Sequence, residues 1–148
     1  TIGAMCNRKV ITVQRNTTVL QAAILMREFH VGDVVVVKNV KNKVVPVGIV
    51  TDRDIVIELV ATELDYRVIT AGDIMLAELT AAKESDGVFE TIQLMASKGV
   101  RRLPVVGNSG ELVGIVTLDD LLLLLAKELG ALTELVAREQ ENEATQRR

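Results

Sequence analysis

The chain has 148 residues, of which 49% are apolar, with a formal net charge of −3 and a mean hydropathy of +0.31. The longest unbroken apolar run, residues 121–126, is far shorter than the ~20 residues of a membrane-spanning helix, so we expect no membrane span. The basic residues are scattered, so we expect no nucleic-acid surface. Cys6 is the only cysteine, which excludes an internal disulfide and a thiolate metal cluster and fits a cytoplasmic protein. No secretory signal is visible, and because the chain opens on Thr1 its natural start is left open.

The first half of the chain predicts a strand, a helix, two strands and a second helix. We expect the strands at residues 10–13, 34–37 and 44–50, the first helix up to Phe29 and the second over residues 52–63. Thr18 followed by Gln21 is a capping-box pattern that starts the first helix. Residues 38–43 are expected to form a loop, and Pro46 indicates an edge strand or a strand start.

The second half repeats this order after a linker over residues 64–72. We expect a helical turn at 71–75, strands at 79–82, 103–106 and Leu112–Thr117, a helix over Val88–Lys98, a tight turn at 107–110, and a last helix from Leu118.

Matching positions lie at a constant spacing. Val19 and Met26 precede Val88 and Met95 by 69 residues each (88 − 19 and 95 − 26), and Val31 precedes Val100 likewise. Gly48 and Gly114 are 66 apart (114 − 48), so we expect three extra residues in the 38–43 loop of the first unit. The sequence therefore predicts an α+β fold in which two βαββα units pack about a pseudo-twofold axis, with a C-terminal helix.

The last helix carries a seam of apolar residues that step by three and four: Leu122, Leu125, Leu129, Leu132 and Val136. Two interpretations remain open, because the seam could cover the chain's own sheets or pack against the same helix of a second copy. The high apolar content favours a homodimer. Residues 140–148 are polar and are expected to fray.

One motif is written twice, as Gly48-Ile49-Val50-Thr51-Asp52-Arg53-Asp54 and as Gly114-Ile115-Val116-Thr117-Leu118-Asp119-Asp120. Its threonine stands where a buried strand becomes a helix, and the free N–H groups and dipole of a helix N-terminus favour an anion. The Thr-x-x-Asp pattern is also close to a capping box, which binds nothing. Both interpretations are kept.

The two units resemble a tandem pair of CBS domains, the Bateman module named after cystathionine β-synthase. The resemblance rests on the two in-register motifs, on Met26 and Met95, on residues 99–106 and on the lead-in Asp73-Ile74-Met75, and it covers roughly residues 2–126. It places CBS domain 1 at residues 2–63, a linker at 64–72, CBS domain 2 at 73–126, and a helix extension with a polar tail at 127–148.

The resemblance implies an adenosine nucleotide in the cleft between the repeats, with the Asp on the ribose, the Thr at a phosphate and the base in an apolar slot. The first site would consist of Thr12, Val34, Ile49, Thr51, Arg53 and Asp54. The second would consist of Arg101, Arg102, Pro104, Ile115, Thr117 and Asp120. Ala81 and Asp119 replace Thr12 and Arg53 in the second site and weaken it, and the two arginines could serve the first site instead.

The leading hypothesis is a non-catalytic regulatory module that binds AMP, ADP or ATP, senses energy state and requires no cofactor. NAD or S-adenosylmethionine are alternative ligands, and an interaction scaffold with degenerate sites is the alternative function. His30 is the only histidine and no nucleophile–base pair is visible, so neither an enzyme nor a metal site is expected. Any effector would be a separate protein.

Overall fold

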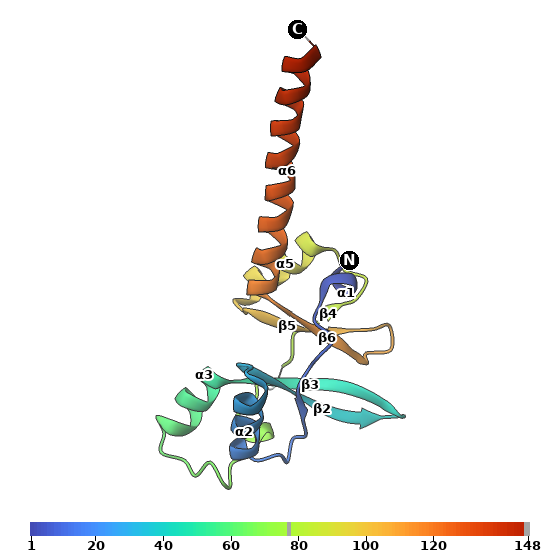
Figure 1. The fold of residues 1–148 in the computed structure, drawn as a ribbon. Coiled ribbons are helices and arrows are strands. Elements are labelled where there is room, and N and C mark those ends of the chain that lie inside the picture. The colour runs from blue at the N-terminus through green and yellow to red at the C-terminus, as the bar shows by residue number, and fades with distance from the viewer. Residues whose placement is uncertain (77, 147–148) are drawn as a thin grey trace. The chain divides into compact units, whose positions relative to one another are not determined.

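The computed structural model describes residues 1–76 and 78–146 and divides into two units, Thr1–Val116 and Thr117–Arg148. The second unit is built on one long helix, α6 (Leu118–Gln146). The first sheet has the order β1 (Thr12–Val13), β2 (Asp33–Val40), β3 (Lys43–Thr51), and the second has the order β4 (Ala82–Lys83), β5 (Arg102–Val106), β6 (Leu112–Thr117). The other helices are α1 (Ile2–Met5), α2 (Val19–Phe29), α3 (Asp52–Ile55), η1 (Val56–Val60), α4 (Ala71–Ile74) and α5 (Val88–Lys98). Figure 1 labels α1, α2, α3 and α5 among them.

Both repeats are built in the same way, which confirms the predicted α+β fold. In each repeat a parallel pair of strands, β1 with β2 or β4 with β5, is joined by a helix of 11 residues. Parallel neighbours need such a crossover, because a tight turn can join only antiparallel strands. The helix α5 has the predicted bounds, and α2 begins at the predicted capping box, in which Thr18 and Gln21 exchange hydrogen bonds of 3.1 and 3.2 Å.

The β2–β3 hairpin is longer than the sequence predicts. The expected loop over residues 38–43 mostly extends the two strands, and the turn itself consists of Lys41 and Asn42, with φ of 48° and 64°. Two consecutive left-handed residues suit a two-residue hairpin turn. The three extra residues of the first repeat therefore lengthen the hairpin. Pro46 lies on the edge strand β3, as predicted, beside an irregularity in the ladder at Val36 and Val37.

Four other predicted segments differ in extent. Strands β1 and β4 are shorter than expected, with two residues each, and β4 shares only Ala82 with the strand predicted over 79–82. The helix expected over residues 52–63 is α-helical only as far as Ile55 and continues as the π-helix η1, whose wider winding is rare outside single turns. The expected fraying from residue 140 is wrong up to Gln146, because this stretch is rich in helix-forming Glu, Gln and Ala. Arg147 and Arg148 lie outside the described residues.

The short helix that leads into each repeat packs on the other repeat. The N–H of Gly3 in α1 donates to the Glu84 carbonyl next to β4 at 2.9 Å, and the N–H of Gly72 in α4 donates to the Arg15 carbonyl next to β1 at 2.9 Å. The two contacts are equivalent, since 72 − 3 and 84 − 15 both give 69. The repeats therefore exchange lead-in segments about a pseudo-twofold axis, and α1 lies beside β4 in Figure 1.

The valine run of β2 is buried on both faces of its sheet. Val34 and Val36 belong to a core cluster with residues of α2 and α4, whereas Val35 and Val37 pack with Ile115 of β6. A strand covered on both sides has no polar face, which explains four consecutive valines where an alternating pattern would be usual. The second of these clusters joins the two repeats.

Candidate functional site

Thr51 ends β3 and caps α3, as the repeated motif predicts. Its Oγ accepts the N–H of Asp54 at 3.1 Å, and Asp54 Oδ2 accepts the N–H of Thr51 at 2.9 Å, which completes a capping box. Among the described residues, Oδ2 is the only carboxylate oxygen of Asp54 that accepts a hydrogen bond, so Oδ1 remains open to another donor. Capping and ligand binding are therefore compatible at this residue.

A pocket of about 420 Å³ lies in front of this cap. Three segments line it: the β3–α3 junction (residues 48, 49 and 51–54), the stretch before β4 (76 and 78–80), and the α5–β5 junction (98–103). The first segment belongs to one repeat and the other two belong to the second, so the pocket lies between repeats. Its volume falls in the range of about 300–1,000 Å³ that is usual for small-molecule sites.

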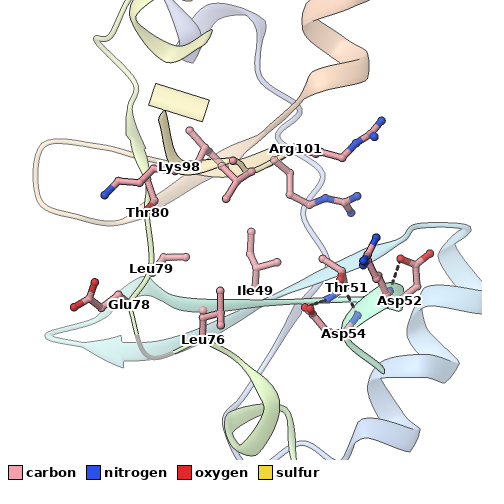
Figure 2. A pocket seen from close by; sticks show the side chains of 16 residues that line it. Ile49, Thr51, Asp52, Asp54, Leu76, Glu78, Leu79, Thr80, Lys98 and Arg101 are labelled. Atoms are coloured by element: carbon pink, nitrogen blue, oxygen red, sulfur yellow. Dashed lines mark hydrogen bonds between the residues drawn. The ribbon is translucent and has the colours of Figure 1, made fainter. Parts of the chain in front are cut away.

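The pocket is polar at its ends and apolar in between. Figure 2 shows Thr51 and Asp54 at one end, Ile49 and Leu79 in the middle, and Lys98 near the opposite end. Because Asp54 and Ile49 lie near the same end of β3, one ligand can meet a carboxylate and an aliphatic surface together. The arrangement suits a molecule with a hydroxyl-bearing part joined to a flat apolar part.

Arginine and lysine side chains surround the pocket, but they are not equally available. Arg102 Nη1 pairs with Asp33 Oδ2 at 2.6 Å, and both side chains are largely buried, with exposed fractions of 26% and 17%. Arg53, Lys98 and Arg101 form no ion pair with any described residue. These three cations can therefore meet an anionic group, while the position of Arg102 is fixed by Asp33.

Asp33 and Arg102 are equivalent positions of the two repeats (102 − 33 gives 69). A contact between equivalent positions lies on the axis that relates the repeats. The ion pair therefore links the first residue of β2 to the first residue of β5 at the rim of the pocket.

The structure brings together four of the six residues predicted for the first site, namely Ile49, Thr51, Arg53 and Asp54. Thr12 and Val34 do not line this pocket. Thr12 is exposed on β1, and Val34 is fully buried in the cluster beneath α2. The sequence placed the base slot inside the first repeat, whereas in the structure Leu79 and Thr80 of the second repeat line the same pocket as Ile49.

The residues predicted for the second site are divided between the two structural units, Thr1–Val116 and Thr117–Arg148. Arg101 and Arg102 line the pocket beside Thr51, in line with the alternative that they serve the first site. Pro104 and Ile115 are buried, Pro104 within β5 and Ile115 against β2. In the second unit, Thr117 Oγ accepts the N–H of Asp120 at 3.1 Å.

Sequence reasoning missed Leu76, Glu78, Leu79, Thr80 and Lys98 as pocket residues. The signal was the constant spacing of 69 residues, because a pseudo-twofold axis places the motif of one repeat against the lead-in of the other. That consequence follows from packing between distant segments and not from any local pattern.

A second capping box shows what the Thr-x-x-Asp pattern does outside the pocket. Thr70 and Asp73 exchange hydrogen bonds of 2.9 and 3.3 Å at the start of α4, and neither residue lines the pocket. The bond from the Thr70 N–H lowers the pKa of the Asp73 carboxyl. This pair is an internal reference for a purely structural cap. In the described part of the chain, no three His, Cys, Asp or Glu side chains gather to hold a metal ion.

The profile of the CBS domain matches residues 2–61 and 71–127. The chain belongs to the CBS domain family. Both matched stretches fall on the repeats described above, and together they cover most of the chain. Within residues 1–76 and 78–146, no helix is long and apolar enough to cross a bilayer.

Curated relatives agree with the family. An uncharacterized protein of Methanopyrus kandleri is 40% identical over 121 residues, which are 82% of this chain and 60% of that protein. The chain thus spans less than two thirds of that relative. The CBS domain-containing protein YhcV of Bacillus subtilis is 37% identical over 113 residues, 76% of each chain. Inosine-5′-monophosphate dehydrogenase of Methanocaldococcus jannaschii is 33% identical over 115 residues, which are 78% of this chain but only 21% of the enzyme. The matched CBS pair is a regulatory module and not a catalytic domain.

Solved structures share the fold. A conserved protein from Pyrococcus horikoshii is 33% identical with a TM-score of 0.72, over 82% of this chain and 88% of that chain. The hexameric CBS-CP12 protein from bloom-forming cyanobacteria is 28% identical with a TM-score of 0.72, over 81% of this chain and 68% of that chain. CBSX2 in complex with AMP is 24% identical with a TM-score of 0.71, over 86% of this chain and 96% of that chain, a likeness that extends to the fold alone.

Proposed function

We propose that this CBS pair is a regulatory module that binds an adenosine nucleotide (AMP, ADP or ATP) in the pocket between its repeats. One observation carries the proposal. One pocket holds an open carboxylate oxygen on Asp54, the aliphatic side chains of Ile49 and Leu79, and cations that form no ion pair with a described residue. These are the partners that a ribose, a base and a phosphate need, in that order.

Each contact has a physical basis. The Asp54 carboxylate accepts the ribose hydroxyls, and such charge-assisted bonds are the stronger kind. Ile49 and Leu79 pack against the two faces of the base. The phosphate lies near Thr51, where Arg53 and Arg101 neutralise its charge. These two arginines match the charge of a monophosphate better than that of a triphosphate. The AMP complex of CBSX2, which shares the fold, supports the same ligand class.

The competing function is an interaction scaffold in which Thr51 and Asp54 act only as a helix cap. NAD and S-adenosylmethionine are competing ligands, because they contain the same adenosine. The scaffold predicts that no adenosine compound changes the stability of the protein. It also predicts that removal of the Asp54 carboxylate changes the stability of the protein as much as removal of the Asp73 carboxylate does.

Thermal unfolding against AMP, ADP, ATP, NAD and S-adenosylmethionine separates these functions. A ligand at about 100 times its Kd stabilises the folded state by about 2.7 kcal/mol, which raises the Tm by several degrees in a chain of this size. We expect that shift to be lost in Asp54→Ala and kept in Asp73→Ala, since both variants remove a capping carboxylate but only one lines the pocket. No shift with any of the five compounds contradicts the proposal.

Regulation requires that ligand binding change a surface read by something else. The pocket is lined by both repeats, so an occupied pocket favours one packing of the repeats over another. We propose a separate effector protein as the reader of that change and a homodimer as the working form. The hexameric CBS-CP12 protein, a neighbour of this fold, supports self-association in general terms.

A further inference from the structure

Within its own unit, the helix α6 leaves a long apolar seam uncovered. Over 29 residues it keeps helical geometry, and its seam residues are about half exposed or more, except for Leu125 at 39%. The seam residues at 3–4 spacing are Leu122, Leu125, Leu129, Leu132 and Val136. They occupy about 20 Å of helix at 1.5 Å per residue. Isolated exposed leucines are ordinary, but a continuous stripe of this length marks a contact surface.

We propose that α6 forms a parallel two-stranded coiled coil with α6 of a second copy of this chain. A seam that alternates steps of three and four fits a partner with the same repeat, because each apolar side chain then enters a hole between four residues of the facing helix. A second copy supplies an identical seam. The pairing is therefore isologous, with each copy contributing the same residues.

Charge favours the parallel arrangement. Glu128 flanks the seam, directly before Leu129. In a parallel pair, Glu128 of one helix faces Thr133 of the other. In an antiparallel pair with the apolar parts aligned, Glu128 faces Glu128 of the other copy, and this like-charge contact is unfavourable. The seam also ends at Val136, because the next positions of the same pattern are Glu139 and Glu143. The contact is thus confined to the first part of α6.

Sedimentation of two leucine variants tests the association. Leu129→Glu places a carboxylate inside the seam of both copies, and we expect the dimer dissociation constant to rise by at least about a thousandfold, because two buried leucines are lost and two charges are introduced. Leu123→Glu is the matched control, since Leu123 is 71% exposed and lies outside the seam. We expect this variant to keep the mass of the unchanged protein.

A disulfide test fixes the direction. In a Cys6→Ser background, Leu132→Cys brings two thiols together across a parallel seam, so we expect a covalent dimer on mild oxidation. Glu134→Cys lies outside the seam, with a side chain that is 66% exposed, and should give none. A monomeric unchanged protein overturns the proposal, as does a Leu129→Glu variant that stays dimeric. Dimers without the Leu132→Cys cross-link overturn the parallel arrangement. The inference rests on the homodimer named in the proposed function, so a monomeric protein overturns both. None of these outcomes depends on nucleotide binding, which keeps its own test.

Discussion

The exchange of lead-in segments between the repeats makes a sharp prediction for Gly114. A Cβ at this position would lie 2.7 Å from the Asn7 carbonyl oxygen and 2.7 Å from Cys6 Sγ, where ordinary contacts are 3.4 Å or longer. Asn7 and Ile115 exchange two backbone hydrogen bonds of 2.9 Å, so the segment cannot retreat without stretching both. We expect Gly114→Ala to lower the free energy of unfolding by about 1–3 kcal/mol, the range for overpacked sites.

The equivalent glycine of the first repeat gives the comparison. A Cβ on Gly48 would meet Met75 Sδ at 2.5 Å and Met75 Cβ and Cγ at 3.1 Å; the sulfur can turn aside, and the two carbons need to shift by only a few tenths of an ångström. We therefore expect Gly48→Ala to cost less than Gly114→Ala. Gly130→Ala in α6 is the control, because nothing lies within 4 Å of the added carbon and alanine favours a helix by up to about 1 kcal/mol.

Urea unfolding followed by circular dichroism measures all three variants under the same conditions. The reasoning predicts the order Gly130→Ala above the unchanged protein, then Gly48→Ala, then Gly114→Ala. A Gly114→Ala variant within about 0.5 kcal/mol of the unchanged protein, the range of ordinary surface changes, would refute the packing of the N-terminal segment against β6.

Three other predictions concern charges and the thiol. Asp33→Ala should lower the free energy of unfolding by about 1–2 kcal/mol, because it leaves the largely buried Arg102 side chain unpaired. Glu134→Ala breaks an ion pair whose side chains are 73% and 66% exposed, so in the same urea assay it should change that free energy by less than about 0.5 kcal/mol. Equal effects of the two variants would contradict the linking role of Asp33. Because the pKa of Asp73 is lowered in the folded state, its carboxylate contributes stability above the ordinary pKa of a free carboxyl, and this contribution is lost as the pH falls through the lowered pKa. Asp73→Asn should therefore flatten the acid side of the plot of unfolding free energy against pH. An unchanged slope there would contradict this. Burial raises the pKa of the Cys6 thiol, so iodoacetamide at pH 8 should alkylate it more slowly in the folded than in the urea-unfolded chain, and equal rates would contradict its burial.

Local patterns in the sequence predicted the elements whose ends are marked by local chemistry. The helix α5 runs over Val88–Lys98 as predicted because its apolar residues recur at helical spacing and Gly99 follows in a left-handed conformation. Strand β6 likewise has its predicted bounds. The turn at Lys41 and Asn42 lies inside the loop predicted over residues 38–43, but its two-residue length was not predicted, because no glycine marks its two left-handed residues.

The candidate site was predicted only in part, and the reason is again the range of the interactions. Thr51 and Asp54 carry a local signature, and both line the pocket. Val34, which we expected in the first site, lies in a core cluster and not in this pocket, and a run of four valines does not say which residues face which side of the sheet. Leu79 and Lys98 line the pocket from the other repeat. Such a contact follows from the symmetric packing of the repeats, and no short motif in the sequence indicates it.

The central claim is that Asp54 serves a ligand as well as a helix. Calorimetric titration of AMP, ADP and ATP into the unchanged protein and into Asp54→Asn tests it most directly, because asparagine keeps one acceptor for the Thr51 N–H but replaces the second with a donor. We predict that at least one nucleotide binds, and that Asp54→Asn raises its Kd by roughly 10–150-fold, equivalent to about 1.5–3 kcal/mol, while the folded state keeps its stability. Equal affinity in the two proteins, or no binding to either, would contradict the account and leave Thr51 and Asp54 as a helix cap alone.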